Sequence, residues 1–189
     1  MKRIYERDKE GRRYCRPCHE RVPEHLTEIT LTVPVDMTDA DAFRRKLGEE
    51  NRIHVSVTSL IIKAAANALE DFPLLYGCWE GDDRVRLPNP GEITLQGPVR
   101  VGNMLGFFTI EKASQKTLLE ISEELDFQVS EVKLKKKGLE VPSSSIPSFN
   151  ISNIGTLGPV ESGGLSGLSS IVAFMGVPAI LEKPAVKDG

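Results

Sequence analysis

The segment Thr58-Ser-Leu-Ile-Ile-Lys-Ala-Ala-Ala-Asn-Ala-Leu-Glu-Asp71 has apolar residues at most of its positions. On a helix of 3.6 residues per turn its leucine, isoleucine and alanine side chains extend nearly all the way round. Only one thin stripe is polar, formed by Ser59, Lys63, Asn67 and Glu70. A helix with this pattern is mostly buried. Pro73 follows it and cannot continue a helix. We therefore predict a buried helix that ends just before this proline.

Two elements are predicted on the N-terminal side of this helix. Residues Leu26–Asp36 alternate in polarity, which predicts a strand with one buried face formed by Ile29, Leu31, Val33 and Val35. The sequence Thr38-Asp-Ala-Asp41 resembles a capping box. It predicts a helix to about Glu50 that buries Ala42, Phe43 and Leu47.

The C-terminal side mixes strands with one long helix. A hairpin is expected within Leu74–Leu87, and two strands, Glu92–Val101 and Leu105–Glu111, are joined by a tight turn at Gly102-Asn103. The remaining expected elements are a helix and two strands, at Ser114–Lys137, Ser148–Ser152 and Ile171–Gly176. The last run is apolar without alternation, as in a central strand. This mixture predicts an α/β two-layer sandwich, with a mixed sheet and helices on one face.

Composition limits the possible functions. The 189 residues carry 24 basic and 27 acidic side chains, a formal charge of −3, which argues against a dedicated nucleic-acid binder. No secretory signal or membrane span is recognisable. Three cysteines fit a reducing cytoplasm. Residues 1–25 are expected to form a charged N-terminal arm, and 26–189 a single domain.

Local motifs provide little evidence for a metal site, a cofactor site or a catalytic site. Cys15-Arg-Pro-Cys18-His19 has the spacing of one metal knuckle, but it lacks the second pair that structural zinc sites use, so we favour the absence of a metal. The chain has no dinucleotide fingerprint and no phosphate loop. Its three histidines, His19, His25 and His54, are interpreted as ordinary surface residues.

Several stretches together resemble the catalytic domain of the dihydrolipoyl acyltransferases of 2-oxoacid dehydrogenase complexes. They are Leu31-Thr-Val-Pro-Val-Asp-Met-Thr38, Val57-Thr-Ser-Leu-Ile-Ile-Lys-Ala-Ala-Ala66, Ser148-Phe-Asn-Ile-Ser-Asn-Ile-Gly155 and Glu182-Lys-Pro-Ala-Val-Lys-Asp-Gly189. The resemblance extends over about 26–189, in the family's order. It implies a chloramphenicol-acetyltransferase-like fold and a homotrimer or larger assembly. It also implies acyl transfer between a dihydrolipoyl thiol and coenzyme A, with coenzyme A as a substrate and no covalently bound cofactor.

The resemblance also implies one catalytic residue. The family's oxyanion-stabilising serine corresponds to Ser152, and a serine that caps a strand end is the alternative interpretation. The family's basic histidine lies in Asp-His-Arg-x-x-Asp-Gly, and no segment up to Gly189 resembles that motif. Relative to the family, the domain is expected to be incomplete at its C-terminus. Gln96 stands where the family usually has glycine, on a strand expected to approach the substrate channel.

Three hypotheses remain open at this stage. The chain is an acyltransferase-like subunit that needs a second chain with a His-x-x-x-Asp-Gly segment, and is inactive in isolation. Alternatively, it is a non-catalytic oligomeric scaffold or a subunit that binds coenzyme A or acyl groups, because an unperturbed thiol is mostly protonated at neutral pH without a base. The third hypothesis is a truncated chain whose exposed sheet edges would favour aggregation.

Overall fold

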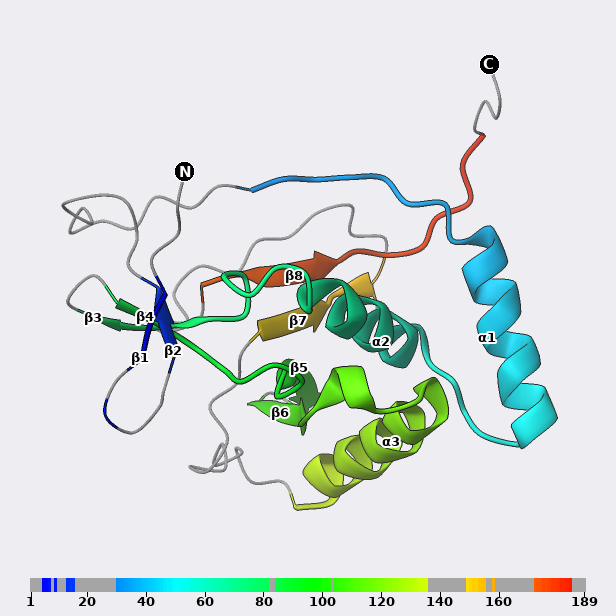
Figure 1. Cartoon of the computed structure of the whole chain (residues 1–189). Coiled ribbons are helices and arrows are strands. Elements are labelled where there is room, and N and C mark those ends of the chain that lie inside the picture. Colours follow the sequence, from blue (N-terminus) through cyan, green and yellow to red (C-terminus); the bar gives the residue numbers. More distant parts are fainter. Residues whose placement is uncertain are drawn as a thin grey trace.

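The structure is a computed structural model, and it describes residues 5–7, 9, 13–15, 30–81, 84–102, 104–135, 149–155, 158 and 172–184. Within them lie two four-stranded sheets and three α-helices (Figure 1). The helices are α1 (Thr38–Asn51), α2 (Val57–Leu69) and α3 (Leu118–Lys135), with a short 3₁₀ turn, η1 (Ala113–Gln115), before α3.

The larger sheet has the strand order β6-β5-β7-β8. Its strands are β5 (Leu95–Val101), β6 (Met104–Ile110), β7 (Phe149–Asn153) and β8 (Phe174–Val177). β5 and β6 are antiparallel, whereas β7 is parallel to both β5 and β8, so the sheet is mixed. Helices α2 and α3 pack on one face of it (Figure 1). The predicted α/β architecture with helices against a mixed sheet is confirmed.

The core lies between this sheet and the two helices. Its fully buried large side chains are Ile62 of α2, Ile121 of α3, and Ile93, Leu95, Ile110 and Ile151 from the sheet and the residues before β5. Gly97 allows the central strands to approach closely, because a Cβ there would lie 2.4 Å from Phe108 Cζ and 2.5 Å from the Ile151 carbonyl oxygen. The predicted burial of α2 is therefore confirmed, but Ser59 is buried as well, although it was expected on the polar stripe.

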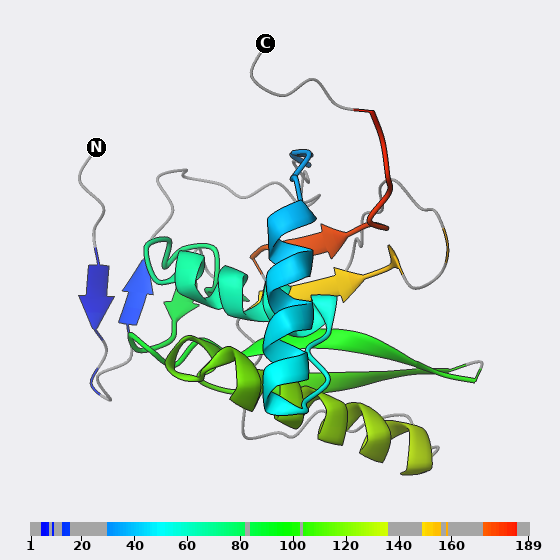
Figure 2. The same ribbon diagram turned by 90° about the vertical axis from the view of Figure 1, so that its right-hand side faces the viewer.

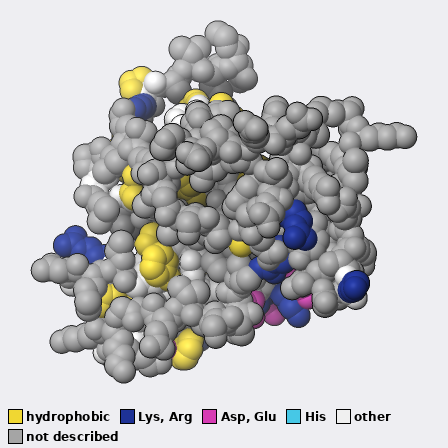
Figure 3. Space-filling view, turned by 90° about the vertical axis from the view of Figure 1, so that its left-hand side faces the viewer, with side chains coloured by type: hydrophobic (Ala, Val, Ile, Leu, Met, Phe, Trp, Pro, Cys, Tyr) yellow, Lys and Arg dark blue, Asp and Glu magenta, His cyan; other side chains and the backbone are white. Residues whose placement is uncertain are grey.

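The smaller sheet lies at one end of the molecule and has the order β1-β2-β4-β3 (Figure 1). It contains the predicted hairpin, β3 (Cys78–Gly81) and β4 (Arg84–Leu87), in antiparallel register. Two strands from within residues 1–25, β1 (Tyr5–Arg7) and β2 (Arg13–Cys15), extend it. Among the described side chains seen from this end, Lys and Arg lie in separate places and form no continuous basic patch (Figure 3).

The strand predicted over Leu26–Asp36 is wrong in its described part. Residues 30–37 contain no strand, and residues 26–29 lie outside the described part of the chain. The side chains expected on a buried face are exposed, namely Leu31 at 88%, Val33 at 74% and Val35 at 70%. Alternation favours an extended chain, but burial of one face needs another surface against it, and none of the described residues supplies one.

Helix α1 matches its predicted range, but its predicted burial and cap are wrong. It has no buried residue, and Phe43 is 54% exposed. The Thr38 amide donates to Asp36 Oδ1, while Asp41 accepts from Arg44 instead of capping the helix. The helix lies at the end of the molecule opposite the smaller sheet, nearest the viewer in Figure 2. An amphipathic pattern therefore did not place this helix in the core.

Two further boundaries differ from expectation. The helix predicted from Ser114 begins as α3 at Leu118, because Thr117 and Glu120 form a reciprocal capping box just before it. The run predicted as a central strand forms β8, which lies at the edge of the described sheet with Met175 38% exposed. An apolar run without alternation does not by itself distinguish a central strand from an uncovered edge.

Candidate functional site

Strand β7 carries the residue singled out by the sequence. Phe149 and Ile151 belong to the core and face α2 and α3. Because side chains alternate along a strand, Asn150 and Ser152 face the opposite side of the sheet. Both are nonetheless buried, with 5% and 4% of their surfaces exposed. Ser152 thus lies on the sheet face remote from the helices, one residue before the strand ends.

Asn153, the next residue, fixes the end of β7. Its Nδ2 donates to Thr58 Oγ1 over 3.0 Å, and its Oδ1 accepts from the Gly155 amide at 3.0 Å. The first contact joins β7 to the start of α2, and the second shapes the turn after the strand. Ser152 is held between the buried strand on one side and this anchor on the other. Its backbone position is therefore fixed on both sides.

A row of polar side chains crosses the same sheet face beside Ser152. Gln96 of β5 pairs in register with Thr109 of β6 on one side and with Asn150 of β7 on the other. The Gln96 amide donates to Thr109 Oγ1 over 3.3 Å. The side-chain oxygen of Asn150 is buried and has no hydrogen-bond partner among the residues that the structure describes. These residues are far apart in the sequence and were not predicted to form a group. The available signal was that an amide follows a core residue at both Leu95-Gln96 and Phe149-Asn150.

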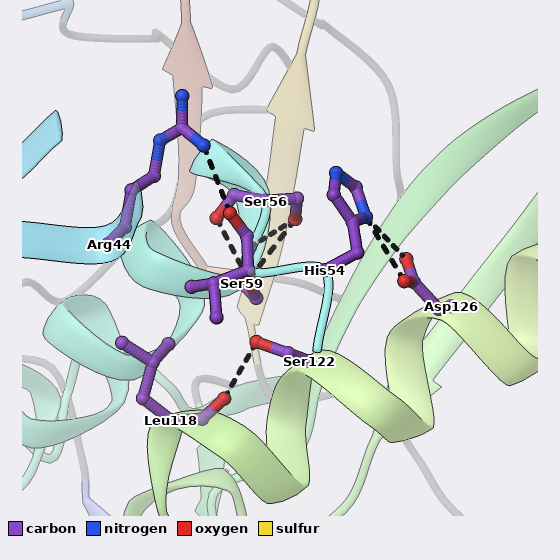
Figure 4. A network of polar contacts seen from close by, with 8 residues as sticks. Arg44, His54, Ser56, Ser59, Leu118, Ser122 and Asp126 are labelled. Carbon is purple, nitrogen blue, oxygen red and sulfur yellow. Dashed lines mark hydrogen bonds and ion pairs between the residues drawn. The ribbon is translucent and has the colours of Figure 1, made fainter. Parts of the chain in front are cut away.

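His54 does not join Ser152. It lies between α1 and α2, and its Nδ1 is 3.0 Å from Asp126 Oδ2 on α3 (Figure 4). This pair belongs to the helix layer, whereas Ser152 faces the other side of the sheet. The His54 side chain is 70% exposed. An exposed side-chain contact of this kind contributes little to stability, and the expectation of a surface histidine is confirmed.

The serines near His54 form a separate network with a structural role. Ser56 caps α2, because its hydroxyl accepts from the Ser59 amide at 3.0 Å (Figure 4). Arg44 of α1 donates to the Val55 carbonyl over 3.0 Å and so ties α1 to this connection. The hydroxyl groups bond to each other and to the backbone, not to the imidazole. We find no nucleophile–base pair in this network.

The remaining candidates can be placed only in part. His19, His25 and Cys18 lie outside the described residues, and so does the side chain of Cys15. Within the described part of the chain, no group of three or more His, Cys, Asp or Glu side chains could hold a metal ion. Cys78 is buried. None of the described helices is both long and apolar enough to cross a membrane.

The fold is that of an acyltransferase core, and sequence comparison identifies the family. The profile described as 2-oxoacid dehydrogenases acyltransferase (catalytic domain) matches residues 21–189. The chain belongs to this family. The resemblance inferred from the sequence motifs is therefore confirmed.

Curated relatives come from two kinds of dehydrogenase complex. The chain is 26% identical over 174 residues to the dihydrolipoyllysine-residue acetyltransferase component of the pyruvate dehydrogenase complex of Rickettsia felis, a match that covers 89% of this chain and 40% of the relative. It is 25% identical over 173 residues to the lipoamide acyltransferase component of the branched-chain alpha-keto acid dehydrogenase complex of Bacillus subtilis, covering 89% and 39%. The chain thus spans about two fifths of the length of these relatives.

A solved structure shows the same fold. It is a truncated catalytic core of the 2-oxoacid dehydrogenase multienzyme complex from Thermoplasma acidophilum. The TM-score is 0.68 at 27% identity, over 79% of this chain and 67% of the other. Homologous cores are thus parts of multienzyme assemblies.

Proposed function

We propose that this chain is a subunit of an acyltransferase that moves an acyl group between a dihydrolipoyl thiol and coenzyme A. The observation that carries the proposal is the placement of Ser152, buried on a strand whose end is fixed by Asn153. The family membership supplies the reaction class. Coenzyme A acts as a substrate, and no covalently bound cofactor is required.

The chemistry assigned to Ser152 follows from its position. When a thiol attacks the carbonyl carbon of a thioester, negative charge develops on the carbonyl oxygen. A hydroxyl that donates a hydrogen bond to this oxygen stabilises the tetrahedral intermediate. Because the strand already holds Ser152 in place, little reorganisation is needed as the charge develops. Removing one such donor typically lowers kcat by about 10²–10³-fold.

The attacking thiol also needs a base, because an ordinary thiol is mostly protonated at neutral pH. His54 is paired with Asp126 in the helix layer and does not serve the face that carries Ser152. We propose that this chain forms a homotrimer or larger assembly and that the basic histidine reaches Ser152 from a second protein with a His-x-x-x-Asp-Gly segment. The exposed apolar side chains of Leu31, Val33 and Phe43 support assembly with other chains.

A non-catalytic role is the second candidate. A trimeric scaffold or a subunit that binds coenzyme A would have the same fold without the base. Within the described residues the histidine is His54, which does not lie at Ser152. Under either function we place the protein in the cytoplasm, because a chain with only three cysteines fits a reducing compartment.

Acyl transfer from acetyl-CoA to dihydrolipoamide tests these functions. The 189-residue chain is assayed alone and in its native complex, with Ser152→Ala as the test variant. Ser122→Ala is the matched control, since Ser122 is equally buried but its hydroxyl donates to the Leu118 carbonyl within α3. A loss of about 10²-fold in kcat for Ser152→Ala, with no such loss for Ser122→Ala, supports catalysis. No transfer in the native complex would favour the scaffold, and equal rates for both variants would remove the role of Ser152.

A further inference from the structure

The polar row formed by Thr109, Gln96 and Asn150 is unexplained by the fold. All three face away from the core, and Gln96 and Asn150 are each only 5% exposed. Asn150 presents a buried side-chain oxygen to which no residue in the described part of the chain donates a hydrogen bond. A buried acceptor without a partner loses its bonds to water and gains nothing in exchange. A leucine of similar size would avoid this cost, so the amide is better explained by a ligand than by stability.

The chemistry of the row defines what it can bind. The Asn150 oxygen can only accept a hydrogen bond, so it needs an O–H or N–H donor. Gln96 lies opposite Asn150 on the next strand, and its amide uses one hydrogen toward Thr109 Oγ1. No described residue accepts its second amide hydrogen, which can therefore be donated to a ligand. A hydroxyl group suits both neighbours, since it donates to Asn150 and accepts from Gln96.

The distance from Ser152 indicates which part of a substrate would carry this hydroxyl. Asn150 precedes Ser152 by two residues on the same strand face, which separates their Cα atoms by about 6–7 Å. With the thioester oxygen hydrogen-bonded to Ser152, the first carbons of the acyl chain come within reach of Asn150. A hydroxyl on the second or third carbon can then bond to its side-chain oxygen.

We propose that Asn150, assisted by Gln96, is a specificity-determining residue that selects acyl groups with a hydroxyl on the second or third carbon. This inference rests on the proposed acyl-transfer site at Ser152. It goes further because it names the substrate class. Thr109 is a positioning residue, since it holds the Gln96 amide over 3.3 Å.

Binding by titration calorimetry tests the inference without requiring turnover. The full chain is titrated with 2-hydroxybutyryl-CoA, 3-hydroxybutyryl-CoA and butyryl-CoA. At least one hydroxylated thioester is expected to bind about five- to tenfold more tightly than butyryl-CoA, the effect of one neutral hydrogen bond to a buried acceptor. Asn150→Leu is expected to abolish this preference. If this variant does not fold, Gln96→Met and the wild-type comparison still test the proposal.

Ser114→Ala is the matched control. The Ser114 hydroxyl is also buried without a partner, but it lies in η1, outside the polar row. This variant should keep the wild-type preference. Equal wild-type affinity for all three thioesters would overturn the inference and leave the proposed function intact.

Two other outcomes count against the inference. If Asn150→Leu weakens the binding of all three thioesters equally, the group that donates to Asn150 is an amide of coenzyme A and not the acyl hydroxyl. If the wild-type chain binds none of the thioesters, both the inference and the proposed coenzyme A site are wrong.

Discussion

Gly97→Ala should destabilise the protein by crowding the centre of the larger sheet. The new methyl group would lie 2.4 Å and 2.6 Å from Cζ and Cε1 of Phe108, and 2.5 Å from the Ile151 carbonyl oxygen. Optimal carbon–carbon contacts are about 3.5–4.0 Å, so the neighbours must move by about 1 Å. The Phe108 ring can shift, but the Ile151 carbonyl belongs to the backbone beside Ser152. We expect a loss of about 1–3 kcal/mol in the free energy of unfolding.

Urea unfolding measures this loss, and thermal unfolding should show a lower Tm, by roughly 2–4 °C for each kcal/mol in a chain of this size. Phe108→Leu in the Gly97→Ala background should restore part of the stability, because it removes one of the two clashes. Gly102→Ala is the control, since a Cβ there meets nothing within 4 Å and costs only the strain of φ +61°. Its effect should add to that of Phe108→Leu. Wild-type stability for Gly97→Ala, or strict additivity with Phe108→Leu, would refute the reasoning.

Three smaller changes test other contacts. Hydrogen bonds from the backbone and side chain of Thr117 hold the pKa of Glu120 below its ordinary value. The Glu120 carboxylate therefore stabilises the fold above the ordinary glutamate pKa, and this stabilisation is lost as pH falls through the folded-state pKa. The stability difference between wild type and Glu120→Gln should accordingly shrink on acidification, and a difference that grows in acid would contradict this sign. Asn153→Ala removes the bond to Thr58 and should cost about 1 kcal/mol in urea unfolding and lower any Ser152-dependent transfer rate, whereas unchanged values would show that the strand end is fixed by other contacts. Ser56→Ala removes the α2 cap and should cost about 1 kcal/mol, with no change in that rate; a changed rate would connect the helix-layer network to the site.

The sequence by itself determined those elements whose pattern depends only on residues close together in the chain. The apolar residues round 58–71 predicted the buried α2, and the turn at Gly102-Asn103 correctly predicted the β5–β6 hairpin. The motif Ser148–Gly155 led to the family, which the profile match confirms. These predictions succeeded because periodicity and turn chemistry depend on neighbours along the chain.

Tertiary structure alone decided which apolar faces are covered and which polar groups meet. The alternating pattern that contains Leu31 and Val33 would suit a strand with one buried face, but both side chains are exposed. Burial depends on a partner surface and not on the pattern itself. The row of Gln96, Thr109 and Asn150 arises from strand registers that join residues up to 54 positions apart in the sequence. Ser152 could be chosen as a candidate from the sequence. Its separation from His54 and its position beside Asn150 follow from the folded strand, in which successive side chains face opposite sides of the sheet.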